Sequence, residues 1–470
     1  MKLKPHIELI YALLGTILIG IVGWNTGLFW DNVLFVHKMS IPLIENGIFA
    51  WGSFPLQVDS GHPPFIATYM TFVWSIFGRS IHVAHIVLYP FVLLFIWELL
   101  QISQALFKSK KFGLIATTII LADPTVFSSL MYVGIEVFVL SFSALAIRGI
   151  IYNDAWRKTI GLMLLGVSSL RGMLLCAGLF LWDLAVKLFV KRYTIKQLCS
   201  WKSILPYIIA SIPAVTFVFW RLLYKGWIIS NPISPWGNAT GFESITDFLI
   251  NFARNIVVFV QRITDFGRVI IWGIVISLLY INRAKIKSND KIIKILLFVL
   301  FSCSPIVIIS LLIKNPMGHS YFLLIYIGLI FLFVELVKNL KWHKIVYTLA
   351  IGVLLLGNLI VYPPHISQGW AASLASLPYW QMRNEVLSYI DTHQIPREKV
   401  LFYFPFGTCA DDIELNNDTR AYAKDINSAL YFVDSNVCNF DDATLKNIKQ
   451  YTPIFHTEKK GVYITLYKLK

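Results

Sequence analysis

Long apolar segments alternate with short polar ones over most of the chain. Several apolar windows exceed about 18 residues, the length a helix needs to cross a bilayer. Lipid cannot satisfy backbone amides, so such segments must be helical. The pattern predicts an α-helical polytopic membrane protein with about eleven transmembrane helices. We expect these helices over residues 7–29, 82–106, 112–130, 134–150, 159–171, 173–190, 203–223, 267–282, 295–313, 320–337 and 345–362.

One further apolar run, residues 65–77, is short and interrupted by threonine, serine and tyrosine. We interpret it as a helix lying at the outer membrane interface. Lys2 and Lys4 place the N-terminus in the cytoplasm, and with 65–77 interfacial every basic cluster between spans also falls inside. A full crossing by 65–77 would place those clusters outside. The C-terminus is therefore expected outside.

The composition becomes more polar from about residue 363. Short strand-like runs at 400–403, 431–433 and 461–468 alternate with helix-like runs at 382–391 and 442–450. This alternation predicts a small α/β domain. The chain thus divides into a transmembrane domain, 1–362, and an extracytoplasmic domain, 363–470.

Composition and charge agree with this class. Hydrophobic residues make up 57% of the 470 and charged residues only 14%, against about a quarter in soluble proteins. The net charge of +15 is explained by cytoplasmic loops, so we expect no nucleic-acid partner. The five cysteines make no metal-binding spacing. Cys409 and Cys438 could pair if their domain faces an oxidising compartment.

The first outer loop, residues 30–81, is the strongest candidate for chemistry. It opens with Asp31 directly after the first span, and a carboxylate there can act as a general base or be merely solvated. His62 precedes two prolines, which either form only a stiff helix entrance or hold His62 near a lipid phosphate. Other ionisable residues of the loop add weight to Asp31: His37, Glu45 and Asp59.

Three later positions could face the same outer cavity. Glu136 lies at the outer end of a span, where ionisable groups are costly and usually functional. Arg171 ends the short span 159–171; a short span leaves a cavity, and an arginine at its tip suits a phosphate or simply snorkels to the interface. His319 and Tyr321 lie at the start of another helix on that side.

The order and spacing of these features over about residues 1–365 resemble the GT-C membrane glycosyltransferases. They are most similar to bacterial relatives of protein O-mannosyltransferases and lipid A aminoarabinose transferases (the family 39 and 83 type). The resemblance implies a GT-C-like transmembrane domain and a polyprenyl-phosphate sugar donor. It also implies that Asp31 and Glu136 are the catalytic acids. The residues it implies for binding the donor phosphate are His62, Arg171, His319 and Tyr321.

Two positions depart from the family pattern. Asn32 stands where many members have a second acid, and Gly61 stands where some have glutamate. We therefore assign no metal ligand and no definite cofactor, and leave a divalent metal open.

The expected function is transfer of a hexosyl or pentosyl group to an acceptor on the extracytoplasmic side of a bacterial inner membrane. The acceptor is an unidentified lipid, glycan or protein, and membrane lipids are the other partners. One alternative is an O-antigen ligase or polymerase, for which the loop 224–266 with Arg254 and Arg262 is a candidate. The other is a lipid or polysaccharide flippase, which predicts inverted repeats or ionisable residues near span midpoints. We find no repeat, and the acids lie at outer ends.

Overall fold

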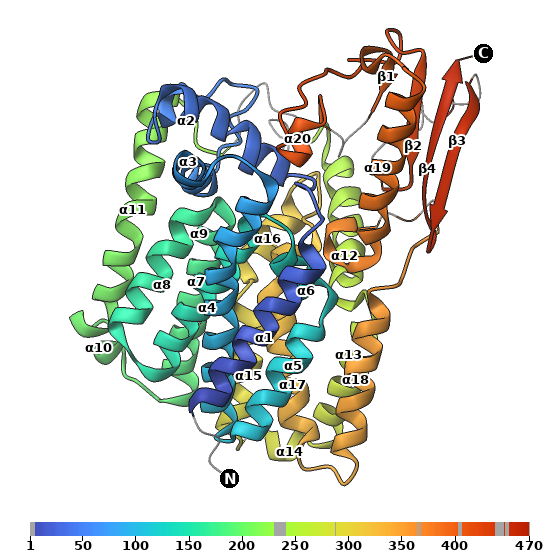
Figure 1. The fold of residues 1–470 in the computed structure, drawn as a ribbon. Helices are drawn as coiled ribbons and strands as arrows, with labels where there is room; N and C mark the ends of the chain where they lie inside the picture. The colour runs from blue at the N-terminus through green and yellow to red at the C-terminus, as the bar shows by residue number, and fades with distance from the viewer. Residues whose placement is uncertain are drawn as a thin grey trace.

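The computed structural model describes residues 5–229, 241–286, 288–363, 366, 368–402, 407–437, 446 and 451–469. A bundle of long helices carries a smaller helix-and-sheet region at one end, and the N-terminus lies at the opposite end (Figure 1). The loop that follows the first helix lies at the same end as the helix-and-sheet region. Both regions predicted to face the same side of the membrane are therefore on one side of the bundle.

The helices of the bundle follow the apolar segments of the sequence. Their bounds are α1 Pro5–Gly23, α4 Ile81–Phe107, α5 Lys110–Ala122, α6 Pro124–Met131, α7 Ile135–Tyr152, α8 Ala155–Ser168, α9 Leu170–Ala185 with the π-helix η3 Val186–Val190, α10 Ile195–Leu198, α11 Trp201–Lys225, α12 Ile245–Thr264, α13 Arg268–Ile281, α14 Arg283–Ile286, α15 Asp290–Phe301, α16 Ser304–Leu312, η4 His319–Phe322, α17 Leu323–Val337 and α18 His343–Gly357.

Within the described residues, six helices are long and apolar enough to cross a membrane, or up to eight if each bent helix pair forms one span. Three shorter apolar helices cover Ile7–Gly23, Phe65–Phe77 and His343–Gly357. The class of polytopic helical membrane protein is confirmed, while the count of eleven spans stays a prediction.

Burial separates the centre of the bundle from its lipid-facing rim. Every residue of α17 is buried, whereas α1 and α11 expose large apolar side chains such as Ile21 (70% exposed) and Leu223 (84%). Exposed apolar surface of this extent requires an apolar solvent. These outer faces are therefore the surfaces that contact lipid.

Two helix pairs are sharply bent, and a buried ion pair joins the two bends. α5 and α6 meet at 73°, and α12 and α13 at 91°. Asp123 caps α6 by accepting from the backbone N–H groups of Thr125 and Val126. The same carboxylate accepts from Arg268 of α13 at 2.6 and 2.7 Å. The interrupted helices are thereby fixed to each other inside the bundle.

The first outer loop contains the π-helix η1 Val33–Lys38, α2 Ser40–Asn46, the 3-10 helix η2 Trp51–Ser53 and α3 Phe65–Phe77. Figure 1 shows α3 nearly end-on while the neighbouring helices α4 and α7 run along the bundle. A helix lying crosswise at the end of the bundle agrees with the interfacial interpretation of residues 65–77, which stays a prediction.

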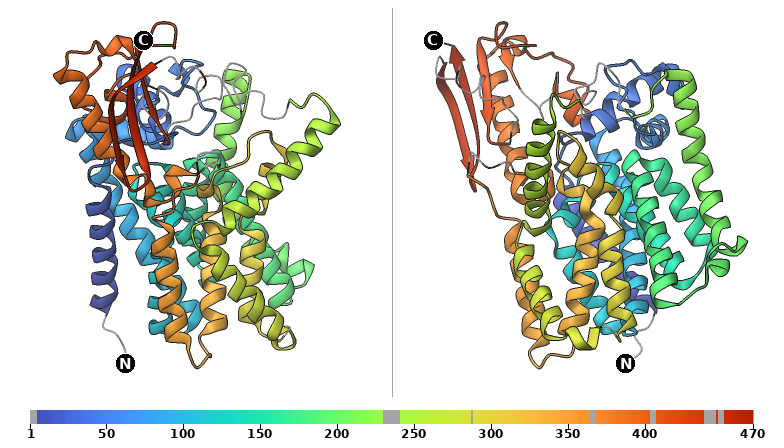
Figure 2. Two further views of the ribbon diagram at one scale, coloured as in Figure 1. Left: turned by 90° about the vertical axis from the view of Figure 1, so that its right-hand side faces the viewer. Right: turned by 180° about the vertical axis from the view of Figure 1, so that it is seen from behind.

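The C-terminal region consists of η5 Trp370–Ala372, η6 Leu374–Ser376, α19 Leu377–Thr392, η7 Arg397–Lys399, β1 Val400–Leu401, α20 Asp411–Glu414, β2 Tyr431–Ser435, β3 Tyr451–Lys459 and β4 Val462–Leu469. Its sheet has the order β1-β2-β4-β3, with β1 parallel to β2 and the other pairs antiparallel. Helix α19 lies between the sheet and the bundle (Figure 2). The predicted mixture of helix and strand is confirmed.

Some details of this region differ from the prediction. The helix expected at 382–391 begins at Leu377, and β3 was not predicted. The helix expected at 442–450 lies outside the described residues, apart from Lys446. Among the described residues Cys409 pairs with no other cysteine. Its expected partner Cys438 lies outside the described residues, so the pairing stays a prediction.

The C-terminal region shares a core with the bundle. Trp380 and Phe29 lie 5.3 Å apart between ring centroids, and the hydroxyls of Tyr132 and Ser376 are 2.7 Å apart. The hydroxyl of Thr125 donates to the carbonyl of Ala372 at 3.0 Å. The helices of the bundle and the C-terminal region therefore pack together around the first outer loop.

Candidate functional site

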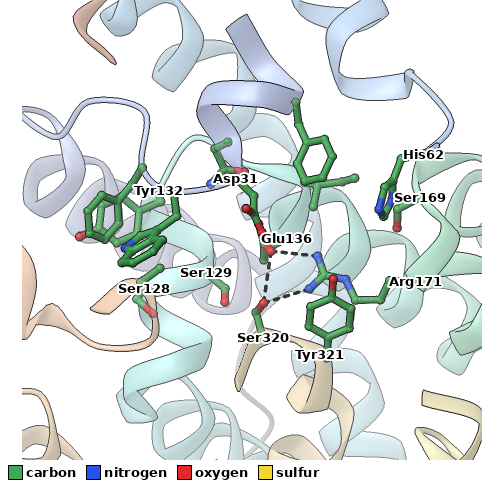
Figure 3. Close-up of a pocket in the computed structure, with 16 residues that line it drawn as sticks. Asp31, His62, Ser128, Ser129, Tyr132, Glu136, Ser169, Arg171, Ser320 and Tyr321 are labelled. Atoms are coloured by element: carbon green, nitrogen blue, oxygen red, sulfur yellow. Dashed lines mark hydrogen bonds and ion pairs between the residues drawn. The ribbon is translucent and has the colours of Figure 1, made fainter. Parts of the chain in front are cut away.

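A cavity of about 110 Å³ lies where the first outer loop, four helix termini and the C-terminal region meet. Its lining is Phe29, Trp30, Asp31, Asn32, Phe35, His62, Ser128, Ser129, Tyr132, Ile135, Glu136, Ser169, Arg171, Ser320, Tyr321 and Ala371. Figure 3 shows Asp31, Glu136 and Arg171 facing one another across it, with His62 to one side and Tyr132 to the other.

Asp31 enters the cavity from a tight turn between α1 and η1. Trp30 before it has φ of +52°, an uncommon conformation for an aromatic residue that persists only where the surroundings impose it. The ring of Phe29 packs at 5.1 Å on Tyr132 and at 5.3 Å on Trp380, which supplies that constraint. Among the described residues, no side chain donates a hydrogen bond to the carboxylate of Asp31, which is exposed to the cavity.

Asn32 joins the first outer loop to the start of α7. A Cβ added to Gly134 would lie 2.6 Å from the amide atoms of Asn32, so a larger residue at this position would have to move the Asn32 side chain. Gly134 is the N-cap of α7, and Glu136 follows in the first helical turn. A carboxylate is favourable at a helix N-terminus because of the helix dipole. The contact thus sets Asp31 beside Glu136.

Arg171 lies in the first turn of α9, after the N-cap Ser169 accepts from the backbone N–H of Gly172 at 2.9 Å. A Cβ on Gly172 would collide with the carbonyl of Leu165 in α8, so the turn between the two helices is tight. A cation at a helix N-terminus opposes the helix dipole. Arg171 therefore depends on a nearby acid.

Glu136 supplies that acid. Its Oε1 accepts from Arg171 Nη2 at 2.9 Å, and Arg171 Nη1 donates to Ser320 Oγ at 3.0 Å. The hydroxyl of Ser320 donates in turn to Glu136 at 3.3 Å. The guanidinium carbon lies 4.7 Å from the ring centroid of Tyr321. The Arg171 side chain is 4% exposed, so these contacts fix its direction.

The surroundings of Asp31 favour its protonated form. Burial by the surrounding protein and the nearby charge of Glu136 raise the pKa of Asp31, and the charge of Arg171 opposes them only in part. A carboxyl with a raised pKa is a stronger base once it is ionised. Asp31 is thus better suited to accept a proton than an ordinary surface aspartate.

His62 lies beside Arg171, and a second ion pair holds its loop. Arg221 of α11 donates to Asp59 at 2.5 Å, with the two side chains 2% and 0% exposed. The same Asp59 accepts from the backbone N–H of Gly61 at 3.2 Å. Burial, Arg171 and Arg221 lower the pKa of His62 to about 4. The imidazole is therefore neutral at pH 7 and can donate one hydrogen bond, but it brings no charge.

Neither a protein-family model nor a curated protein sequence matches this chain. One solved structure matches along its whole length: the crystal structure of ArnT from Cupriavidus metallidurans bound to undecaprenyl phosphate. The match has a TM-score of 0.52 at 10% sequence identity and covers 98% of each chain. The chain has a GT-C fold. The fold implied by the sequence resemblance is thereby confirmed.

Five of the six residues assigned from the sequence line the cavity of this GT-C fold: Asp31, His62, Glu136, Arg171 and Tyr321. The sixth, His319, does not. Its Nε2 lies 2.6 Å from Asp265 Oδ2, and Asp265 also accepts from the hydroxyl of Tyr362 at 2.6 Å. His319 is buried in a network that holds the bend between α12 and α13, while the next two residues reach the cavity.

The other ionisable residues of the first loop do not add to the cavity as expected. Asp59 pairs with Arg221, and His37 contacts acids of the C-terminal region. Glu45 is exposed to solvent. Each lies outside the cavity lining, so the weight that they gave to Asp31 was misplaced.

Several polar residues of the lining were not predicted from the sequence: Ser128, Ser129, Tyr132 and Ser169. Ser128 and Ser129 follow the Asp123–Pro124 helix break, and Ser169 marks the break between α8 and α9. Helix breaks inside apolar segments were the available signal, because such breaks at membrane depth line cavities.

The residues present do not suggest a metal site. Among the described side chains, no group of three or more His, Cys, Asp or Glu could hold a metal ion. The cavity offers two carboxylates, and Glu136 already pairs with Arg171. What the cavity does provide is a base, a fixed cation and several hydroxyls, which suit the transfer of a group away from an anionic leaving group.

Proposed function

We propose that this protein transfers a sugar from a polyprenyl-phosphate donor to an acceptor on the extracytoplasmic side of the membrane. The observation that carries the proposal is the convergence of Asp31, Glu136 and Arg171 in one cavity. Asp31 comes from the turn before η1, and Glu136 and Arg171 come from the first turns of α7 and α9. The fold is shared with a structure that holds undecaprenyl phosphate.

The donor phosphate is expected at Arg171. Its guanidinium is fixed by Glu136 and Ser320, and the N-termini of α7 and α9 point their backbone dipoles toward the same space. His62 would donate a neutral hydrogen bond, and Tyr321 shapes the wall beside the guanidinium. His319 would act only indirectly, by holding the segment that carries Ser320 and Tyr321.

The acceptor is expected beside Asp31. The acceptor O–H or N–H gives its proton to the Asp31 carboxylate while its oxygen or nitrogen forms a bond to the anomeric carbon of the sugar. The bond between that carbon and the phosphate oxygen breaks, and polyprenyl phosphate leaves. Arg171 stabilises the charge that gathers on the leaving phosphate. Glu136 is the second acid: it orients Arg171 and makes Asp31 more basic.

Membrane placement follows from the same proposal. The donor's lipid stays in the bilayer, so the site must open at a membrane surface. The basic loops favour a cytoplasmic N-terminus. The first outer loop, which contributes to the cavity lining, lies at the other end of the bundle, the end that carries the C-terminal region. We infer a bacterial inner membrane, with the C-terminal region on the extracytoplasmic side.

The test is a transfer assay with purified protein in lipid vesicles and radiolabelled polyprenyl-phosphate sugars, scored by release of free polyprenyl phosphate. Asp31→Asn should lower the rate by about 10² to 10⁴-fold, the range of general base catalysis. Asp425→Asn, which changes an exposed carboxylate in the C-terminal region, is the matched control and should transfer normally.

Two results would contradict the proposal. One is full activity in Asp31→Asn. The other is wild-type protein that moves intact donor across the vesicle membrane without releasing polyprenyl phosphate, because translocation leaves the phosphoester unbroken.

A further inference from the structure

The short helix α20 of the C-terminal region is inserted against the first outer loop. Figure 1 shows α20 between α19 and the group formed by α2 and α3. The N–H of Leu28 donates to the carbonyl of Ile413 in α20 at 2.9 Å. A Cβ on Gly27 would lie 2.7 Å from Ile413 and 2.9 Å from Trp380. The chain just before Asp31 is therefore packed directly on the C-terminal region.

Side-chain contacts between charged groups join the same two regions. Arg79 donates to both carboxylate oxygens of Asp411, at 2.5 and 3.1 Å. Its Nη2 is 3.1 Å from His37 Nδ1, and His37 Nε2 is 3.4 Å from Asp412. Lys38 lies 3.5 Å from Asp412. We call these five residues the α20 contact.

The two acids and the histidine of the α20 contact are buried, and its two basic side chains, which balance the acids in charge, are partly exposed. The side chains of His37, Asp411 and Asp412 are 4%, 9% and 6% exposed. Burial opposes ionisation of Asp412, but hydrogen bonds from His37 and Thr408 and the charge of Lys38 outweigh it, so its pKa lies well below the ordinary value. Buried charges of this kind need their partners. The contact therefore opposes separation of the two regions.

One short element, η1, connects the α20 contact to the cavity. His37 and Lys38 end the π-helix η1, which begins at Val33, two residues after Asp31. The N–H of Phe35 donates to the carbonyl of Asp31 at 3.0 Å. Asp31 itself has no side-chain partner among the described residues, so its direction depends on the backbone on either side. That backbone is held by Ile413 before it and by the α20 contact after it.

We propose that Arg79, His37, Asp411 and Asp412 are positioning residues, through which the C-terminal region holds Asp31 in its working place. The proposal rests on the proposed function for its catalytic readout. It assigns the C-terminal region a part in the transfer step itself, because misplacing a reacting group by about 1 Å can lower a rate by about 10²-fold.

Arg79→Gln is the decisive variant, because it breaks the contact and keeps both acids, which accept hydrogen bonds from the backbone N–H groups of Asn417 and Thr408. We expect kcat to fall by about tenfold, a moderate displacement on that scale. The KM for the donor should stay within about twofold, since Arg171 and His62 are untouched. Hydrogen exchange should accelerate in residues 33–38 without spreading through the bundle. Arg79→Lys, which retains one ion pair, should recover part of kcat.

Asp391→Asn is the matched control. Asp391 pairs with Arg397 and Arg420 inside the C-terminal region and does not touch the first loop, so kcat and exchange in residues 33–38 should stay as in wild type.

Unchanged exchange in Arg79→Gln would overturn the structural half of the proposal, and faster exchange with unchanged kcat would overturn the positioning role. A loss of kcat in Asp391→Asn equal to that in Arg79→Gln would also overturn the positioning role. If Arg79→Gln unfolds globally, the milder variant Lys38→Gln takes its place, and unchanged kcat and exchange in that variant would overturn the proposal. If wild-type protein transfers no sugar, the proposed function fails, while hydrogen exchange still decides whether the contact orders residues 33–38.

Discussion

Variants that remove the charge of Arg171 should affect the free energy of unfolding and the rate of sugar transfer separately. In Arg171→Gln the carboxylate of Glu136 loses its cationic partner at 2.9 Å and, among the described residues, keeps the hydroxyl of Ser320. An unpaired carboxylate in a partly buried site is costly. The variant also lacks the fixed cation that we expect to stabilise the leaving phosphate.

The expected loss of stability can be estimated from exposure. Breaking a fully buried ion pair by removing one partner costs about 3–5 kcal/mol. Arg171 is 4% exposed, but Glu136 is 18% exposed and can reach water in the cavity. We therefore expect Arg171→Gln to lower the free energy of unfolding by about 2 kcal/mol, below that range because Glu136 stays partly hydrated.

The double variant Arg171→Gln, Glu136→Gln should recover most of this stability, because two amides can hydrogen-bond where one charge would be unpaired. Transfer should not recover. Loss of one preorganised group that stabilises developing charge lowers kcat by about 10² to 10³-fold, and both variants lack it. Thermal unfolding in detergent and the radiolabelled transfer assay measure the two quantities on the same preparations.

The ion pair of Arg148 and Glu98 offers a matched control. It has the same 2.9 Å separation, with the side chains 18% and 5% exposed, and joins α7 to α4 away from the cavity lining. Arg148→Gln should lose at least as much stability as Arg171→Gln, because Glu98, the acid left unpaired, is only 5% exposed, and it should keep its activity per folded molecule. The reasoning is refuted if Arg171→Gln transfers sugar at the wild-type rate, or if the double variant recovers activity together with stability.

Two further predictions concern pH and the first loop. The transfer rate should fall as pH drops through the raised pKa of Asp31, because only the ionised carboxylate accepts a proton. Glu136→Gln removes a charge that raises this pKa, so it should move the acidic limb of the pH–rate profile to lower pH. An unmoved limb would exclude an effect of Glu136 on the pKa of Asp31. Asp59→Asn should destabilise the protein by about 3 kcal/mol, because Arg221 is left buried without its acid. Asp154→Asn changes a more exposed pair and should cost under about 1 kcal/mol. Equal losses of stability in the two variants, measured by thermal unfolding, would contradict this.

The bundle could be predicted from the sequence because lipid imposes a simple rule on it. A segment such as 82–106 must be apolar and helical to cross a bilayer, and it appears as Ile81–Phe107. Asp123 before Pro124 indicated a helix cap, and Asp123 does cap α6. The sharp bends at Asp123 and Asp265 were not predicted, since they depend on buried contacts between distant parts of the chain, Asp123 with Arg268 and Asp265 with His319. Strand β3 was not predicted either. It contains Pro453 and a register shift, so it lacks the regular alternation that marks a strand.

Part of the cavity lining could be predicted, because ionisable residues at the ends of apolar helices often have a function. Glu136 was recognised because an ionisable group at membrane depth is costly to keep, and Arg171 because it ends a span too short to cross the membrane. His319 was chosen for its place at the start of another helix on the same side and for the family resemblance, and yet it serves the bend near Asp265. The sequence shows that a buried charge needs a partner, but only the folded chain shows whether that partner is a neighbouring helix or a space for ligand.

Charge balance connects the unpaired Asp31 with the paired Arg171. A sugar phosphodiester donor carries one negative charge, and the polyprenyl phosphate product approaches two above its second pKa of about 6. The proton released by the acceptor neutralises Asp31 in the same step. The total charge in the cavity therefore stays constant while negative charge moves from Asp31 toward Arg171. Such a transfer requires this arrangement: Asp31 has no side-chain partner among the described residues and faces Arg171, which Glu136 holds in place. Neither Asp31 nor Arg171 must then reorganise as the charge moves.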